Sequence, residues 1–106
     1  MKKYEIIKDK REFDDIIHNA PYLKNKYYVI YNKERAPKFP RFGLAVGKKI
    51  GNAVTRNRVK RQIRSIIDNN KNLFQNSKDY IIIVKRNFLD LSFQDMEREL
   101  KSLLEK

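Results

Sequence analysis

The chain of 106 residues contains no cysteine, and this absence excludes several kinds of chemistry. Without cysteine there is no disulfide framework, no thiolate nucleophile and no cysteine-ligated metal site. The single histidine, His18, and the adjacent carboxylates Asp14 and Asp15 match no metal-ligand spacing such as HExxH. The three glycines form neither of the phosphate-binding patterns GxxxxGK[ST] and GxGxxG. We therefore predict no catalytic residue and no metal site on this chain.

Long apolar runs are also missing from the sequence. The first residues, MKKYEIIKDKREF, lack the apolar run of about 7 to 15 residues that a signal peptide requires. No apolar stretch reaches the ~18 residues of a membrane-spanning helix. We expect a cytoplasmic protein. Neither a linker nor an internal repeat interrupts the chain, so residues 1–106 are expected to form a single domain.

Acidic residues are absent from one long segment. Ten of the 25 lysines and arginines lie between Arg35 and Ile67, where there is no aspartate or glutamate; the rest of the chain holds 15 basic and all 13 acidic residues. Nearly all of the formal net charge of +12 therefore arises in this segment. A charge of this size, concentrated in one segment, indicates an anionic partner such as nucleic acid or an anionic membrane surface.

The same segment predicts a helix with one apolar and one cationic face. Asn52 is a suitable N-cap, and AVTRNRVKRQIRSIIDNN continues from it without a helix breaker. At about 100° per residue, one arc is apolar and consists of Val59, Ile63, Ile66 and Ile67. The opposite arc consists of Asn57, Arg58, Lys60, Arg61 and Arg64. Arg56 falls at the edge of the apolar arc, so its stem can pack on the domain while its guanidinium reaches outward.

The cations of this helix are expected to bind phosphates. Solvated helix faces usually interleave acidic and basic residues at a spacing of four, which is the alternative interpretation of any charge run. Here the repulsion between like charges is unrelieved, and it is costly without an anionic partner. Arginine also suits bidentate contacts to phosphate oxygens. Lys48 and Lys49, at the end of the preceding strand, extend the patch.

The remaining pattern predicts an α+β fold. A first helix over 10–20 is capped by Asp9 and ended by Pro21. Strands are predicted over 26–32 and 41–49, and the proline-containing loop between them suggests an antiparallel hairpin. A buried strand over 79–86 and an amphipathic helix from residue 92 complete the order α-β-β-α-β-α, a two-layer sandwich of helices on a small sheet. The βαβ unit around the basic helix would be right-handed by default.

Aromatic side chains supply a second candidate surface. Alternation along the first strand places Tyr27 and Tyr31 on one face and Tyr28 on the other, so not all of these rings can lie deep in the core. Phe13 on the first helix should face the sheet. Rings beside a basic helix can form a platform on which unpaired bases stack, although core packing is the alternative for each ring.

One segment resembles a known family. RFGLAVGKKIGNAVTRNRVKRQIR, residues 41–64, is similar to the signature of the bacterial ribonuclease P protein subunit, including the sequence Arg56, Asn57 and Arg58. A basic helix is common, but this ordered set of residues after a glycine-containing strand is specific. The resemblance extends more loosely to the first helix with its phenylalanine, the strand with its tyrosines, DYIIIVKR and the final amphipathic helix.

The resemblance implies a function that composition alone does not. The family is similar in fold to the second domain of a small-subunit ribosomal protein, with a left-handed βαβ crossover in place of the default. Its members assist a catalytic RNA that removes the 5′ leader of precursor tRNA, and the RNA performs the Mg²⁺-dependent hydrolysis. The implied partners are therefore ribonuclease P RNA and precursor tRNA, with no membrane and no obligate protein partner.

The resemblance also implies site residues by position. The residues expected to bind RNA are Arg56, Asn57, Arg58, Lys60, Arg61 and Arg64, with Lys48 and Lys49 beside them. The cleft for the single-stranded leader is expected to be lined by Phe13, Ile17, Tyr28 and Tyr31. Ile17 stands where the family often has a second aromatic residue, which weakens stacking at that end of the cleft.

Three alternatives are compatible with the sequence. A ribosomal or RNA-assembly protein of related fold would copurify with ribosomal particles and leave leader removal unaffected. A membrane-surface module would need apolar residues beside the cations, but the apolar face of the basic helix is required for the core. A self-sufficient nuclease would cleave RNA without an RNA subunit.

Overall fold

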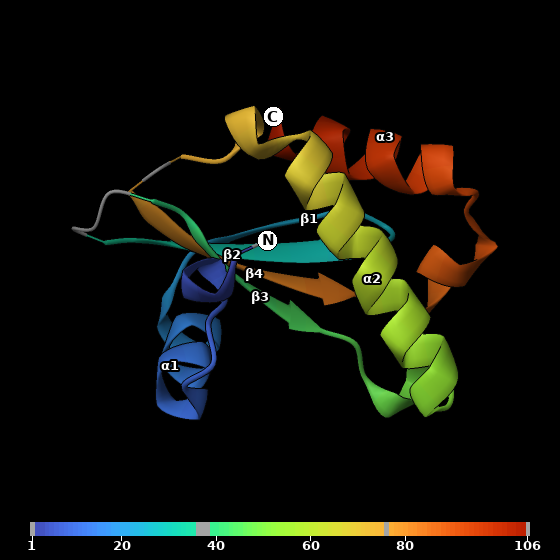
Figure 1. The fold of residues 1–106 in the computed structure, drawn as a ribbon, viewed down its shortest axis with the longest axis horizontal. Coiled ribbons are helices and arrows are strands. Elements are labelled where there is room, and N and C mark those ends of the chain that lie inside the picture. Colours follow the sequence, from blue (N-terminus) through green and yellow to red (C-terminus); the bar gives the residue numbers. More distant parts are fainter. Residues whose placement is uncertain (1, 36–38, 76, 106) are drawn as a thin grey trace.

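In the computed structural model, residues 2–35, 39–75 and 77–105 are described, and they form three α-helices packed on a four-stranded sheet (Figure 1). The helices and strands in chain order are α1 (Lys10–Asn19), β1 (Tyr22–Lys24), β2 (Tyr28–Glu34), β3 (Arg41–Ala45), α2 (Ala53–Asn69), β4 (Lys78–Val84) and α3 (Phe93–Leu104). The predicted α+β class is confirmed. Residues 36–38 of the predicted proline-containing loop lie outside the described residues.

Each α-helix begins at a side-chain cap. Asp9 accepts a hydrogen bond from the backbone N–H of Arg11 at 2.8 Å, and Asn52 accepts one from Thr55 at 2.9 Å. The hydroxyl of Ser92 does the same for α3. These caps satisfy backbone donors that have no partner within the helix. The starts predicted for the first two helices are thereby confirmed.

The strand order is β1-β2-β4-β3. Strand β4 is antiparallel to β2 and parallel to β3, so β3, α2 and β4 form the predicted βαβ unit. The left-handed sense of that crossover stays a prediction. The antiparallel hairpin predicted for residues 26–49, which contain β2 and β3, is wrong, because β4 lies between these two strands in the sheet. β4 is apolar on both faces, and such a strand stabilises the sheet most from a central position.

The two faces of the sheet carry separate apolar cores, which Figure 1 shows as helices on opposite sides. Tyr28, Ile30, Phe42 and Ile82 face α2 and α3 and belong to the larger core. Ile81 faces the other way and packs with Ile7 and Ile16 in a smaller core beneath α1. The two-layer prediction did not include this third layer, because periodicity does not tell which face of a sheet a helix covers.

Strand β1 was not predicted. Its three residues directly follow Pro21, and three residues are too few for alternation to be read from sequence. It pairs antiparallel with β2, with Tyr22 opposite Tyr31 and Lys24 opposite Val29. Strand β1 therefore forms one edge of the sheet.

The N-terminal segment covers the other edge. Ile6 forms a parallel bridge to Phe42, and the backbone N–H of Ile7 donates to the Phe42 carbonyl at 2.9 Å. The buried carboxylate of Glu5 accepts two bonds from Nζ of Lys71, at 2.6 and 2.8 Å. Burial alone would raise the pKa of Glu5, but the hydrogen bonds from Lys71 and the Lys2 backbone outweigh it and lower the pKa. This segment is thus tied to both β3 and the end of α2.

Helix α2 buries the residues that its periodicity predicted, and Val59, Ile63, Ile66 and Ile67 are each at most 1% exposed. Full burial of an apolar side chain stabilises a folded protein by about 1.5–3 kcal/mol, and each of these four side chains holds the helix to the sheet in this way. The opposite face of α2 is consequently fixed in place although it contributes nothing to the core.

Gly43 allows α1 to approach β3 closely. A Cβ atom at this position would lie 2.7 Å from Cε2 of Phe13 and 3.3 Å from Cγ1 of Ile81. The first separation is shorter than van der Waals contact, so any side chain here would displace the Phe13 ring or the strand.

Gly43→Ala is therefore expected to lower the free energy of unfolding by about 1–3 kcal/mol. In a Phe13→Ala background the same substitution should cost far less, because the obstructing ring is gone. Urea denaturation of the four chains measures both costs. An equal cost in the two backgrounds would show that Phe13 is not the obstacle.

Candidate nucleic-acid interface

Helix α2 presents a cationic face to solvent. Asn57, Arg58, Arg61 and Arg64 are exposed, and Lys60 is partly buried. A single turn of 3₁₀ helix, Lys48–Ile50, precedes α2 and exposes Lys48 and Lys49 beside its N-terminus. The two lysines thus lie in a turn and not at the end of the longer strand that was predicted.

Arg56 lies at the boundary between the two faces of α2. Its side chain is partly buried, and its Nε atom is buried without a hydrogen-bond partner among the described residues. The predicted packing of its stem against the domain is confirmed. A guanidinium fixed in this way loses less conformational freedom when it binds an anion than a fully mobile side chain does.

The cations of this face are unpaired. Across residues 2–35, 39–75 and 77–105, none of the ion pairs involves Lys48, Lys49 or a basic residue of α2. The absence of acidic residues in the surrounding sequence is therefore not compensated by carboxylates brought in from other elements. The repulsion inferred from the sequence persists in the fold, and an anion can relieve it.

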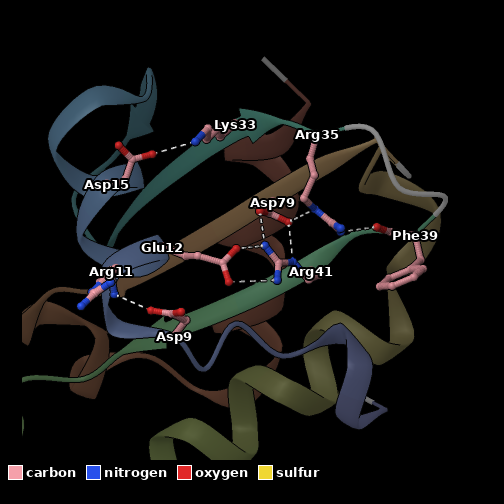
Figure 2. A network of polar contacts seen from close by, with 9 residues as sticks. All are labelled: Asp9, Arg11, Glu12, Asp15, Lys33, Arg35, Phe39, Arg41 and Asp79. Atoms are coloured by element: carbon pink, nitrogen blue, oxygen red, sulfur yellow. Dashed lines mark hydrogen bonds and ion pairs between the residues drawn. The ribbon is translucent and has the colours of Figure 1, made fainter.

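Two other arginines of the acid-free segment behave differently (Figure 2). Asp79, at the start of β4, is only 3% exposed and accepts hydrogen bonds from Nε of Arg35 at 2.5 Å and from Nε of Arg41 at 3.0 Å. Nη2 of Arg41 bonds both Asp79, at 2.7 Å, and Glu12 of α1, at 2.5 Å. These bonds raise the pKa of Arg41, first through Asp79 and then through Glu12. Arg35 and Arg41 are thus structural and unavailable to a ligand.

The same network fastens α1 to the sheet. Glu12 of α1 contacts Arg41 of β3, while Asp15 of α1 accepts a bond from Nζ of Lys33 in β2 at 2.7 Å (Figure 2). The bond from Lys33 lowers the pKa of Asp15. Glu12 and Asp15 are three residues apart, so the two contacts lie on one face of the helix, about one turn from each other, and fix its position over the sheet. Phe13, between Glu12 and Asp15 in the chain, is held in the same place.

Phe13 and the cations of α2 share one hollow. A cavity of about 170 Å³ at the β3 edge is lined by Ile6, Ile7, Phe13, Phe42, Leu44, Lys60 and Arg64. It connects the α1 side of the sheet with the cationic face of α2. The two surfaces that were predicted separately therefore meet at this edge.

Helix α1 leaves part of its sheet face uncovered. The cross-strand row of Tyr31, Ile81 and Gly43 lies beneath α1, where Phe13 and Ile17 pack. The next row on that face consists of Val29, Ile83 and Ala45, which are all partly exposed. Beyond Ile83 a hollow of about 610 Å³ is lined by Gly47, Lys48, Lys49, Ile50, Val84, Lys85 and Arg86. We refer to this partly exposed row, together with the hollow and its basic rim, as the cleft.

One residue expected in the cleft lies elsewhere. Tyr28 is fully buried on the opposite face, where its hydroxyl donates to the Met96 carbonyl at 2.8 Å and its ring meets Phe88 edge-on. Burial raises the pKa of Tyr28. Tyr28 cannot line the cleft, because strand alternation places it and Tyr31 on opposite faces. Phe13, Ile17 and Tyr31 do lie together at the cleft side.

Sequence reasoning missed part of this surface. Ile83, Lys85 and Arg86 were not assigned to it, although alternation within DYIIIVKR could have separated Ile81 and Ile83 from Tyr80, Ile82 and Val84. Asp79 was also missed. Nothing local marks it as the partner of two arginines that lie 44 and 38 residues away in the sequence.

The fold and this helix define a class of protein, a small basic α+β domain of the kind found in ribonucleoproteins. Comparison with known proteins is specific: a sequence model of the family described as Ribonuclease P matches residues 1–106. A Mycoplasma mycoides relative named "Ribonuclease P protein component" is 42% identical over 105 residues, covering 98% of this chain and 96% of the relative. The chain belongs to the ribonuclease P protein family.

Solved structures agree with this assignment. The ribonuclease P protein of Staphylococcus aureus has a TM-score of 0.87 and 29% identity, covering 95% of this chain and 93% of that one. The Thermotoga maritima protein has a TM-score of 0.85 and 28% identity, covering 94% of each chain. This chain is accordingly the protein component of a tRNA-processing endoribonuclease and acts with an RNA subunit in the removal of 5′ leaders.

The residues that the structure describes contain no cluster of three or more histidine, aspartate or glutamate side chains that could hold a metal ion. None of their helices is both long and apolar enough to cross a bilayer.

Asp79→Asn is expected to lower the free energy of unfolding by about 3 kcal/mol, because two partly buried guanidiniums lose their shared counter-charge. Asp95→Asn is the matched control. Asp95 pairs with Arg98, which is 71% exposed, and such surface pairs contribute at most about 1 kcal/mol. Urea denaturation measures both variants. Similar small losses would show that Asp79 does not anchor the fold.

Proposed function

We propose that the cationic face of α2 binds the phosphates of ribonuclease P RNA, and that the open sheet face beside α1 binds the single-stranded 5′ leader of precursor tRNA. The proposed RNA contacts are Arg56, Asn57, Arg58, Lys60, Arg61 and Arg64, with Lys48 and Lys49. The proposed leader contacts are Phe13, Ile17 and Tyr31, on a floor that includes Val29 and Ile83. The chain would dock RNA and position substrate.

One observation supports the proposal above the others, namely that the cations of α2 have no carboxylate partners within the described parts of the chain while the helix itself is anchored in the core. A fixed row of unpaired guanidiniums binds a polyanion with little reorganisation, and each phosphate that it neutralises releases counterions. The hollow shared by Phe13, Lys60 and Arg64 supports a continuous path from this row to the cleft.

The cleft presents the chemical groups that bind single-stranded nucleic acid. Phe13 and Tyr31 supply ring faces on which bases stack, Val29 and Ile83 supply an apolar floor, and Lys48, Lys49 and Arg86 supply charge at the rim. Stacking tolerates any base sequence because every base has a flat face. A leader can therefore be held without sequence readout.

We place the Mg²⁺ of the reaction on the RNA subunit. Glu12 and Asp79, two carboxylates on the α1 side of the sheet, are already used in neutralising Arg41. Magnesium supplies a polarised phosphate and an activated water when it is bound. The protein would contribute by fixing the orientation of the substrate. Partnership with ribonuclease P RNA and precursor tRNA also leads us to propose that the protein works in the cytoplasm.

Binding of ribonuclease P RNA should depend steeply on salt. If five to seven phosphates are engaged, log affinity should fall against log salt concentration with a slope of about −4 to −6. Arg58→Ala should make the slope about one unit shallower. Arg98→Ala, on α3, is the control and should leave it unchanged. Filter-binding titrations across a salt series measure the slopes, and a salt-independent affinity would contradict the assignment of α2.

Reconstitution tests the whole assignment. Cleavage of a precursor tRNA by the RNA subunit at low magnesium should be faster with this protein than without it. Phe13→Ala should weaken the affinity of the holoenzyme for a leader-bearing substrate by about 5- to 100-fold, from the loss of one stacking surface, and leave its affinity for mature tRNA unchanged.

Two results of the reconstitution would favour the alternatives. No stimulation by the protein would indicate a ribosomal or assembly role. Cleavage by the purified, RNA-free chain would indicate a self-sufficient nuclease.

A further inference from the structure

Strand β1 extends the α1 side of the sheet past Tyr31. Tyr22 stands directly opposite Tyr31 in the antiparallel register, and the two ring centroids are 5.3 Å apart at an interplanar angle of 49°. Tyr31 itself packs against the core beneath α1. The ring of Tyr22 therefore continues the line of side chains that begins at Phe13, one strand further out.

The structure does not need the Tyr22 ring to hold β1 in place. Leu23, the next residue, points to the other side of the sheet and packs on the larger core. Tyr22 remains 52% exposed, although it contacts Tyr31. A large aromatic ring that is half exposed, and that another ring supports from one side, offers its free face to a ligand.

Lys24 provides a charge beside this ring. Strand alternation places Lys24 on the same face as Tyr22, and its register partner is Val29 of the cleft floor. Lys24 is exposed and forms no ion pair within the described part of the chain. Asp15 of α1 is neutralised by Lys33 and not by Lys24. An aromatic ring and an unpaired ammonium group, two residues apart, match the base and the phosphate of one nucleotide.

We infer that Tyr22 and Lys24 form an outer nucleotide subsite for the single-stranded leader, in which Tyr22 stacks on a base and Lys24 contacts a phosphate. The inference rests on the proposed function of the cleft. Lys60 and Arg64 of α2 border the hollow at the β3 edge, and β1 lies three strands away in the order β3-β4-β2-β1. Three strand spacings are about 14 Å, or about four stacked nucleotides at 3.4 Å each. Only a leader of sufficient length reaches Tyr22.

The test compares the affinity of the reconstituted holoenzyme for precursor tRNAs with leaders of about two and about ten nucleotides, on either side of the span estimated above. Tyr22→Ala should weaken binding of the long-leader substrate by about 5- to 10-fold, the lower range for one stacked base. It should leave the short-leader substrate unchanged. Tyr22→Phe keeps the ring and should bind both substrates as the unaltered protein does. Lys24→Ala should make the salt slope for the long leader shallower by about one unit.

Tyr4→Ala is the matched control, because Tyr4 is 54% exposed and its ring contacts Phe39, away from the cleft. It should not distinguish the two leaders. Wild-type affinity of Tyr22→Ala at both leader lengths, with Phe13→Ala still impaired, would overturn the inference and leave the proposed function standing. Impairment of Tyr22→Ala that is equal for both leaders would also overturn it. If Phe13→Ala leaves the affinity for leader-bearing substrates unchanged, both the proposed cleft and the outer subsite are wrong.

Discussion

The architecture depends on one constraint, namely that strand β4 must be buried on both sides. Tyr80, Ile82 and Val84 belong to one core and Ile81 to the other, so β4 takes a central place in the sheet and requires helices on both faces. Helices α2 and α3 cover the larger core and α1 covers the smaller one (Figure 1). This arrangement puts the phenylalanine of α1 and the basic helix α2 on opposite faces. Both border the hollow at the β3 edge, which is lined by Phe13 and Arg64.

Charge is divided between structure and function within one acid-free segment. Arg35 and Arg41 share Asp79, a carboxylate supplied by the central strand, and Arg41 also reaches Glu12. The contacts to Asp79 are nearly buried, where removing one partner of an ion pair is costly, whereas Glu12 is half exposed. The cations of α2 receive no such partner among the described residues, and they stay in water until a polyanion arrives. The burial of a partner carboxylate thus separates structural arginines from those available for binding, although both kinds lie in one stretch of sequence.

Local patterns predicted the helices well, and long-range pairing limited the rest. The apolar spacing in α2 identified all four of its buried residues, since helical periodicity is a local property. The hairpin was wrong because neighbouring strands in the sequence need not be neighbours in the sheet, and nothing in either strand encodes the insertion of β4. Tyr28 was assigned to the cleft because the resemblance was given more weight than strand alternation. Alternation had already placed Tyr28 and Tyr31 on different faces of the sheet. Asp79 and the short strand β1 lie beyond local reasoning, since their partners are distant or their length is too small.

The covering of the β3 edge by residues 6 and 7 has a consequence for the free protein. An exposed sheet edge offers unpaired backbone groups to a second molecule and invites uncontrolled association. Here one edge is occupied by the N-terminal segment, which Glu5 and Lys71 clamp to the end of α2. The other edge is β1, with only three residues, one of them the charged Lys24. Because both edges of the sheet are protected, the protein can expose a face lined with aromatic rings to solvent without pairing its strands with those of another copy.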